Sequence, residues 1–511
     1  MGRRAPRSPP LGIVLDAAAS GALHEQIGEQ LRSAILERRL APGARLPSSR
    51  LMAAELGCAR GTILTAIDQL IAVGYLAARA ASGVFVATDL PDDMLVPPAV
   101  QRAEERSPPT EPVLPGRTRA LLAARREPAA PDGERPIAFP IGEPDRAAFP
   151  FPHWARLLER EWRRPSWEVA AGAHPFGHSG LREAIAAYLG AARGFGCEAR
   201  DVVVTSGVRQ GVSLFARVVL EAGDDAWIEE PGYSGIRDAL AAAAVRAVPA
   251  PIDGAGFSLD AAMAIAPRAR LAVVAPSHQF PLGTVLSLQR RLSLLSWAER
   301  TQGWIIEDDF DGEYRYSGRP LAPLRALDRH GRVAYLGSFS KLLFPTLRLS
   351  FIVLPAALVE AAEQTMMAHM TPAPMLGQGA LARFIADGDL AAHLRRTRHL
   401  YAIRQQRLVA AANRHLAGLL EVTPDPGGMH LVARPHGNLE PAFDDLAAAA
   451  AAARHGVRVS PLSVQYFNAR KTQGLLLGYA ATPEAEIEPA VIRLGRALGE
   501  TMQSHGEDRM G

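Results

Sequence analysis

Lysine is nearly absent from this sequence, which draws attention to the two positions where it remains. Only Lys341 and Lys471 are lysine among the 56 Lys and Arg residues. Nucleotide bias accounts for most of the preference for arginine, but arginine keeps its proton and cannot act as a nucleophilic amine. Lys341 is therefore a candidate nucleophile, whereas Lys471 stands in a polar loop and is expected to be an ordinary surface residue.

Groups suited to a charged, phosphorylated ligand occur in three segments of the same half of the chain. Residues 205–207, Thr-Ser-Gly, precede a predicted helix, an arrangement in which backbone N–H groups and the helix dipole hold a phosphate. Residues 307–311, Glu-Asp-Asp-Phe-Asp, form a carboxylate cluster that could bind a metal or pair with a cationic ring nitrogen. Residues 337–341, Gly-Ser-Phe-Ser-Lys, contain the candidate nucleophile, and Arg348 follows seven residues later.

The pattern from about residue 136 onward predicts the fold that positions these segments. Short apolar runs alternate with helical stretches, which indicates buried strands joined by crossover helices in a mainly parallel sheet. In such a sheet, polar residues at the carboxyl ends of the strands line the ligand crevice. The predicted strands are residues 202–204, 226–229, 271–275, 303–307, 333–336 and 351–354.

A different pattern occupies residues 20–88. Apolar residues recur every four positions from Leu23 to Ile35 and predict a helix that ends near Leu40. Two shorter helices follow, one from Ser48 and one from about Arg60, and residues 77–86 are typical of a β-hairpin. This order predicts a winged helix-turn-helix, mainly α with a β wing.

Length and composition indicate a soluble protein of several domains. The chain has 511 residues, more than one core usually holds, and its 48% hydrophobic and 21% charged residues are ordinary globular usage. No apolar run approaches the ~18 residues needed to cross a bilayer, and no leader is recognised. The two cysteines lack the spacing of a zinc site and are too few for a disulfide framework. We expect a cytoplasmic protein with domains at residues 20–88 and 136–511 and a Pro-rich linker at 89–135.

The first domain resembles the winged helix-turn-helix of GntR-type transcription regulators. The resemblance rests on the run Leu-Pro-Ser-Ser-Arg at 46–50, the helix over 60–75 with its Gly-Tyr-Leu ending at 74–76, and the wing at 82–86. It implies binding to double-stranded operator DNA. Ala59 and Gly61 depart from the family pattern, where serine and asparagine are common, and could weaken the helix cap or shift the DNA sequence that is read. The resemblance places Ser48 and Arg50 on phosphates, and Arg60, Thr62 and Thr65 at or near base edges.

The second domain resembles fold-type I pyridoxal phosphate enzymes, the aspartate aminotransferase superfamily. A winged helix joined to such a domain is the architecture of the MocR subfamily of GntR regulators. Further matches to that subfamily are Glu-Pro-Gly-Tyr at 230–233, Pro-Ser-His-Gln-Phe-Pro at 276–281 and Leu-Leu-Leu-Gly-Tyr at 475–479. The resemblance implies that Lys341 forms the Schiff base with pyridoxal 5'-phosphate, Asp308 binds the pyridine nitrogen, Tyr233 stacks on the ring, and Ser206, Gly207, Ser338 and Arg348 hold the phosphate. A shift of one residue in the alignment would move the role of Asp308 to Asp309.

Several residues depart from the pattern of the second family. Phe310 stands where a tyrosine hydroxyl often meets the ring oxygen of the cofactor, and His278 or Gln279 could replace it. Phe176 stands where a tyrosine of the partner subunit often reaches the phosphate, and Arg209 stands where glutamine is common. Arg434 and Arg470 are the candidates for an arginine that binds a substrate carboxylate.

Three functions are compatible with these residues. The first is a transcription regulator that binds pyridoxal phosphate, and an amine or amino acid that condenses with it, to change the geometry of two tethered DNA-binding domains. The second is an active aminotransferase with an appended DNA-binding domain, and the third is a large domain that serves only for dimerisation. A homodimer is expected in each case, because fold-type I sites are usually built at a subunit interface. The sequence names neither the effector nor the operator.

Overall fold

The computed structural model describes residues 12–15, 22–79, 83–90, 113–123, 138–172, 174–318, 322–437, 439, 443–467 and 472–507. The chain divides between Val113 and Leu114 into two compact units, which are described separately. Among the described residues, no helix combines the length and the apolar character needed to span a membrane.

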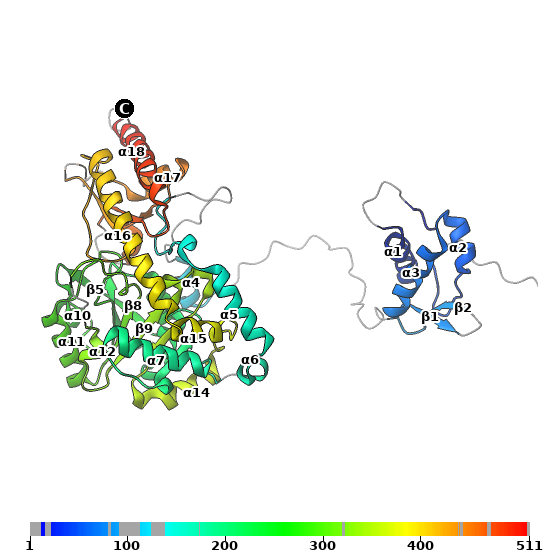
Figure 1. Cartoon of the computed structure of the whole chain (residues 1–511), viewed down its shortest axis with the longest axis horizontal. Helices are drawn as coiled ribbons and strands as arrows, with labels where there is room; N and C mark the ends of the chain where they lie inside the picture. The colour runs from blue at the N-terminus through cyan, green and yellow to red at the C-terminus, as the bar shows by residue number, and fades with distance from the viewer. Residues whose placement is uncertain are drawn as a thin grey trace, which may run out of the picture. The chain divides into compact units, whose positions relative to one another are not determined.

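The first unit is three helices followed by a two-stranded hairpin, as predicted (Figure 1). Its core is formed by the apolar stripe of the first helix and the inward faces of the other two, with Ile27, Leu31, Ile63 and Ile67 almost fully buried. The second helix begins at the side-chain cap of Ser48 and ends at Gly57, whose φ of 65° is the left-handed conformation favoured by glycine. The elements are α1 (Leu23–Leu36), α2 (Ser49–Leu56), α3 (Arg60–Ala72), β1 (Leu76–Arg79) and β2 (Gly83–Val86).

The second unit is built on an eight-stranded sheet with the order β3-β10-β9-β8-β7-β4-β5-β6. Strands β9, β8, β7, β4 and β5 are parallel, which confirms the mainly parallel sheet; β10 runs antiparallel to both of its neighbours, and β6 runs antiparallel to β5. All six predicted strands are present. The bounds are β3 (Val202–Thr205), β4 (Asp225–Glu230), β5 (Arg246–Asp253), β6 (Gly256–Phe257), β7 (Leu271–Val274), β8 (Trp304–Asp309), β9 (Val333–Ser338) and β10 (Ser350–Val353).

Helices cover both faces of this sheet (Figure 1). Apolar residues of α8, α9 and α14 pack in one core cluster, and those of α5, α7, α15 and α16 pack in another. The bounds are α5 (Phe151–Arg163), α6 (Trp167–Ala171), α7 (Ser179–Arg193), α8 (Val208–Val219), α9 (Ser234–Ala242), α10 (Leu259–Ile265), α11 (Leu288–Thr301), α12 (Leu324–Leu327), α13 (Phe339–Leu342), α14 (Val359–His369), α15 (Gln378–Ala386) and α16 (Asp389–His415), with α4 (Gly116–Ala123) preceding them.

A smaller antiparallel sheet completes the second unit, and we call residues 416–507 the C-terminal lobe. The 27-residue helix α16 leads from the large sheet into this lobe. The strand order is β11-β12-β14-β13, and α17 and α18 pack beside each other. The bounds are β11 (Leu420–Val422), β12 (His430–Pro435), β13 (Ser460–Pro461), β14 (Leu475–Gly478), α17 (Asp445–Arg454) and α18 (Glu484–Glu507).

Candidate cofactor site and DNA-binding surface

The strand register brings the predicted site segments to one edge of the large sheet. Ser350, the first residue of β10, pairs with Ser338 on one side and with Thr205 on the other. Asp308, at the end of β8, pairs with Leu336 of β9, two residues before Ser338. The carboxyl ends of β8, β9 and β3 therefore meet at this edge, as the topology of a ligand crevice requires.

Lys341 lies in the short helix α13, directly after β9, and its side chain turns into the crevice rather than to bulk solvent. Its ammonium nitrogen Nζ donates to the carbonyl oxygen of Gly142 at 2.9 Å. Gly142 has a φ of 64°, and a Cβ atom there would overlap Nζ, so only glycine allows this contact. Burial lowers the pKa of Lys341, against the opposing charges of Asp311, Glu143 and Asp308. A lysine with a lowered pKa is more readily uncharged and nucleophilic.

Asp308 and Asp309 lie side by side in sequence but in different surroundings. Oδ2 of Asp309 is paired with Arg193 and accepts the hydroxyl of Tyr335 at 2.5 Å, so this carboxylate is part of a buried network. Asp308 is 8% exposed. Within the described residues, Oδ1 of each aspartate is buried without a hydrogen-bond partner, but Asp308, unlike Asp309, is held by no hydrogen bond or ion pair at its other oxygen. Burial and the neighbouring Asp311 raise the pKa of Asp308 to about 7, with Lys341 opposing. A cation or N–H donor at Asp308 would remove this penalty, which favours Asp308 over Asp309 as the group that meets a ligand.

The predicted phosphate ligands lie at the start of α8 and beside it. Gly207 is the N-cap of α8 and provides no side-chain cap, and a Cβ atom there would lie 3.8 Å from the guanidinium of Arg348. Arg348 is exposed and adopts a φ of 52°, a left-handed conformation that is uncommon for arginine and often found at functional sites. Ser338 accepts the hydroxyl of Ser350 at 3.1 Å. Ser206 is less free, because its N–H and hydroxyl both donate to Oε1 of Gln210, at 2.7 and 3.0 Å.

Tyr233 follows β4 and is the N-cap of α9, on the same edge of the sheet. Its side chain is 41% exposed, and its ring meets Phe280 edge to face with centroids 6.3 Å apart. A Cβ atom on Gly235 would overlap both the Tyr233 ring and Nε of Arg209, so a residue without a side chain keeps these two groups close together. Arg209 therefore places a positive charge beside Tyr233. Phe176, in contrast, is 1% exposed and packs in the core of its own chain.

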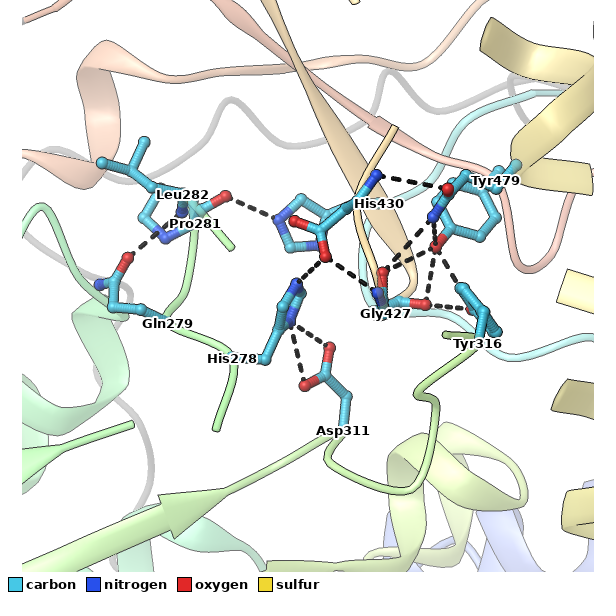
Figure 2. A network of polar contacts seen from close by, with 12 residues as sticks. His278, Gln279, Pro281, Leu282, Asp311, Tyr316, Gly427, His430 and Tyr479 are labelled. Carbon is cyan, nitrogen blue, oxygen red and sulfur yellow. Dashed lines mark hydrogen bonds and ion pairs between the residues drawn. The ribbon is translucent and has the colours of Figure 1, made fainter. Parts of the chain in front are cut away.

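A buried histidine, which sequence reasoning named only as a substitute donor, joins the large sheet to the C-terminal lobe (Figure 2). The ring of His278 is held between two carboxylates: Nδ1 lies 3.0 Å from Oδ2 of Asp311, and Nε2 lies 3.4 Å from Oδ1 of Asp425. Burial alone lowers the pKa of His278, but Asp311 and Asp425 raise it to about 10. His430 of β12 reaches the carbonyl oxygen of Pro281 at 2.9 Å and adds a second link between the two parts.

These contacts occupy most of the donors of His278 and Gln279, the two residues that could replace the missing tyrosine hydroxyl. Both ring nitrogens of His278 face carboxylates, and Nε2 of Gln279 donates to the carbonyl oxygens of Pro231, at 2.8 Å, and Phe280. The ring of Phe310 meets Phe280 edge to face with centroids 6.2 Å apart. Gln279 therefore has no donor to spare, whereas Nε2 of His278 faces Asp425 at 3.4 Å without forming a hydrogen bond.

The remaining candidates are distributed more loosely. Arg434 is exposed on β12 and lines a polar cavity next to Asp425 and His430. Arg470 and Lys471 lie outside the described residues. Within the described ranges, no group of three or more His, Cys, Asp or Glu side chains is arranged to hold a metal ion. In the carboxylate cluster at 307–311, Asp309 is paired with Arg193 and Asp311 with His278.

The predicted DNA contacts cluster at the first turns of α2 and α3. Ser48 caps α2 by accepting the N–H of Leu51 at 3.3 Å, and Arg50 is exposed in the first turn. Arg60 is the first residue of α3, and its Nε donates to Oγ of Ser49 at 3.2 Å, so it bridges the two helices. Thr62 is half-buried and Thr65 is exposed. Ala59 provides no side-chain cap for α3, as its departure from the family pattern suggested.

The comparisons with known proteins agree with this two-part architecture. The model of the bacterial regulatory proteins, gntR family, matches residues 23–86, and that of aminotransferase class I and II matches residues 136–494. The probable rhizopine catabolism regulatory protein MocR of Rhizobium meliloti is 42% identical over 94% of this chain and 94% of its own. The chain belongs to the MocR subfamily of GntR-type transcription regulators.

Other relatives of this MocR-type regulator follow the same division. The pyridoxine biosynthesis transcriptional regulator PdxR of Corynebacterium glutamicum is 30% identical over 94% of this chain and 98% of its own. The solved structure of LysN, an α-aminoadipate aminotransferase from Thermus thermophilus, is 26% identical, covers 76% of this chain and 96% of its own, and has a TM-score of 0.65. That structure contains N-(5'-phosphopyridoxyl)-L-leucine. The fold-type I domain is therefore confirmed, and its match to aminotransferase class I and II supports pyridoxal phosphate as the cofactor.

The described residues of this MocR-type regulator fit that cofactor. The unpartnered oxygen of Asp308 is a position for a ring N–H, and the exposed guanidinium of Arg348 at the uncapped start of α8 is a position for a phosphate. Lys341 has a lowered pKa beside them. The described residues thus include an anionic, a cationic and a nucleophilic group at one sheet edge, the set of groups that a molecule with a basic ring, a phosphate and an aldehyde would need.

Proposed function

We propose that the chain regulates transcription by binding pyridoxal phosphate on Lys341 and altering its affinity for operator DNA in response to the cofactor, or to an amine or amino acid that reacts with it. The observation that carries the proposal is the coincidence of Lys341, the unpartnered Asp308 and the proximity of Arg348 to Gly207 at one sheet edge. When bound, pyridoxal phosphate supplies an aldehyde that amines capture and an electron-withdrawing ring.

Different residues of the chain would bind different parts of the cofactor. Asp308 keeps the ring nitrogen protonated, and Tyr233 covers the ring. Ser206, Gly207, Ser338 and Arg348 hold the phosphate, with Arg209 as an additional charge next to Tyr233. Since Oε1 of Gln210 already accepts both donors of Ser206, phosphate binding at Ser206 would require Gln210 to yield.

The DNA-binding part of the proposal rests on the first unit. Its match to the gntR family implies binding to double-stranded DNA. Ser48 and Arg50 would position phosphates, and Arg60, Thr62 and Thr65 would lie at or near base edges. We further propose a cytoplasmic homodimer that presents two such units, with the domains at residues 20–88 and 136–511 and the linker at 89–135.

The cofactor site is tested by borohydride trapping followed by peptide mass spectrometry. We expect one pyridoxyl adduct, on Lys341, and no adduct in Lys341→Ala. An adduct on another lysine, or none in the wild type, would refute the site. Sustained release of keto acid over many cycles would show an active aminotransferase rather than a sensor.

The regulatory part is tested by footprinting, with cofactor and amines titrated, on DNA that the protein selects from a random pool. A response of DNA affinity to the cofactor, lost in Lys341→Ala, supports sensing. Arg60→Ala should lose the footprint while its cofactor absorbance stays unchanged. A footprint that survives this substitution would contradict the placement of α3 at the DNA.

A further inference from the structure

The helix α3 has one buried and one open face. Ile63, Ala66, Ile67 and Leu70 are at most 5% exposed and pack in the core of the first unit. The opposite face begins at the first residue of the helix. Its exposed members in the first three turns are Arg60, Gly61, Leu64, Thr65, Asp68 and Gln69.

The polar side chains in the first two turns of this face already have contacts. The hydroxyl of Thr65 donates to the carbonyl oxygen of Gly61 at 3.0 Å, one helical turn earlier. Nε of Arg60 donates to Oγ of Ser49, which directs the arginine toward the first turn of α2. Both groups are therefore oriented by the protein before any DNA is present.

Leu64 is the apolar member of this face and is 40% exposed. It stands one turn after Arg60 and one turn before Asp68, on the same line along the helix. Gly61, one turn closer to the start of the helix than Thr65, has no atom within 4 Å of the position of a Cβ. The surface beside Leu64 is thus open backbone on which another molecule can approach closely.

A leucine side chain cannot read hydrogen-bond donors or acceptors. The base-pair edges in the major groove offer one hydrocarbon group, the C5-methyl of thymine. If a recognition helix enters the groove with its N-terminal turns at the base edges, a leucine in its second turn is placed to contact that methyl.

We propose that Leu64 is a specificity-determining residue that selects a thymine in each half-site by contact with its C5-methyl group. The open backbone at Gly61 allows the approach, and the contact of Arg60 with Ser49 fixes the neighbouring side of the helix. This inference rests on the proposed entry of α3 into the major groove and is independent of the cofactor.

The test is a methyl-deletion scan of the DNA. Full-length, cofactor-loaded protein selects duplexes from a random pool, and each thymine of the selected site is then replaced by deoxyuridine, which removes the methyl and keeps the base pair. At fixed salt, we expect one position per half-site at which the wild type loses about fourfold in affinity, the factor for one buried methyl group. Leu64→Ala should bind the thymine site about as weakly as the wild type binds the uracil site, and should be indifferent to uracil at that position.

A matched variant separates this contact from a general loss of binding. Val73 is 57% exposed and apolar and lies at the other end of the same helix, so Val73→Ala should retain the full sensitivity to uracil. Equal sensitivity of Leu64→Ala and the wild type at every thymine, or no sensitive thymine in the wild type, would overturn the inference. Failure to select any sequence would refute the placement of α3 as well. The wild-type scan alone can refute the inference, and Leu64→Ala, which truncates a side chain that is 40% exposed and outside the core, assigns a sensitive thymine to Leu64.

Discussion

Exchanging each of two adjacent carboxylates for its amide gives a direct test of the candidate site. Asp308→Asn removes the anion whose Oδ1 has no partner among the described residues, and Asp309→Asn removes the anion that Arg193 and Tyr335 already hold. The two substitutions are chemically identical and one residue apart, so each serves as the control for the other. We expect opposite consequences for stability and for cofactor affinity.

Asp308→Asn should stabilise the cofactor-free protein at pH 8. The pKa of Asp308 is raised from 3.8 to about 7, so this group disfavours folding at every pH above 3.8 and costs its full amount above 7. The cost is on the order of 4 kcal/mol, at ~1.4 kcal/mol per pKa unit. An unpaired amide in the same place costs ~1 to 3 kcal/mol. The expected net gain is about 1 to 3 kcal/mol in the free energy of unfolding.

Cofactor affinity should change in the other direction. A hydrogen bond to a charged group is worth ~1.5 to 3 kcal/mol, so Asp308→Asn should weaken pyridoxal phosphate binding by about 10- to 150-fold. Asp309→Asn should instead cost ~3 to 5 kcal/mol of folding stability, because it leaves the Arg193 guanidinium buried without its anion. Binding by the Asp309→Asn protein that remains folded should be nearly unchanged.

Urea unfolding of the cofactor-free proteins and absorbance titration with pyridoxal phosphate give both quantities. The assignment of Asp308 would be refuted if Asp309→Asn lost cofactor affinity while Asp308→Asn bound like the wild type. Loss of stability in Asp308→Asn without loss of affinity would show that this carboxylate has a structural partner instead.

Three further outcomes are expected. Arg348→Ala should weaken pyridoxal phosphate binding at least tenfold and leave the affinity for pyridoxal unchanged, since only the former has a phosphate; equal losses in a titration with both vitamers would contradict the phosphate role. The cofactor-free protein should become less stable against urea as the pH rises from 6.5 to 10. Burial raises the pKa of Glu229 to about 8, and the effect of burial on His278 is outweighed by its carboxylate neighbours, which raise the pKa of His278 to about 10. Both groups therefore bind more protons in the folded state than in the unfolded state. A flat urea midpoint over this range would contradict those environments. Phe310→Tyr should tighten cofactor binding by about 2- to 12-fold, the value of one added hydrogen bond, whereas unchanged affinity would show that the ring oxygen lies elsewhere.

The large sheet could be predicted from sequence because its signal is local. Each strand is a short run of buried aliphatic residues, and residues 202–204 and 333–336 are fully buried in the structure as the runs indicated. The direction of a strand within a sheet is not encoded in its local sequence, and the sequence did not predict that β10 is antiparallel to its neighbours. It follows from the short connection between Ser338 and Ser350, which turns back through α13 and cannot span the sheet to return in parallel.

The sequence signals for the strands of the C-terminal lobe are weaker than those for the strands of the large sheet. Its strands are two to six residues long, and the Leu-Leu-Leu run at 475–477 was recognised only as a family motif. For the same reason Asp425 and His430 were not named. Asp425 meets His278 across 147 positions of sequence, and no spacing pattern reports a contact of that kind. The one available sign was the presence of His278 in the Pro-Ser-His-Gln-Phe-Pro motif at 276–281.

The contacts of His278 with Asp311 and Asp425 also bear on how cofactor binding could be linked to DNA binding in the proposed regulator. A regulator must convert an event at the cofactor into a change of shape, which requires a group that contacts both the crevice and a part that can move. Asp311 lies among the charges that act on Lys341 and Asp308, and Asp425 belongs to the C-terminal lobe. His278 is the cation shared by these two carboxylates. A change of charge at Lys341 or Asp308 therefore alters the field on an ion pair that helps to hold the lobe, and this gives the proposed sensor a physical connection from the cofactor crevice to the lobe.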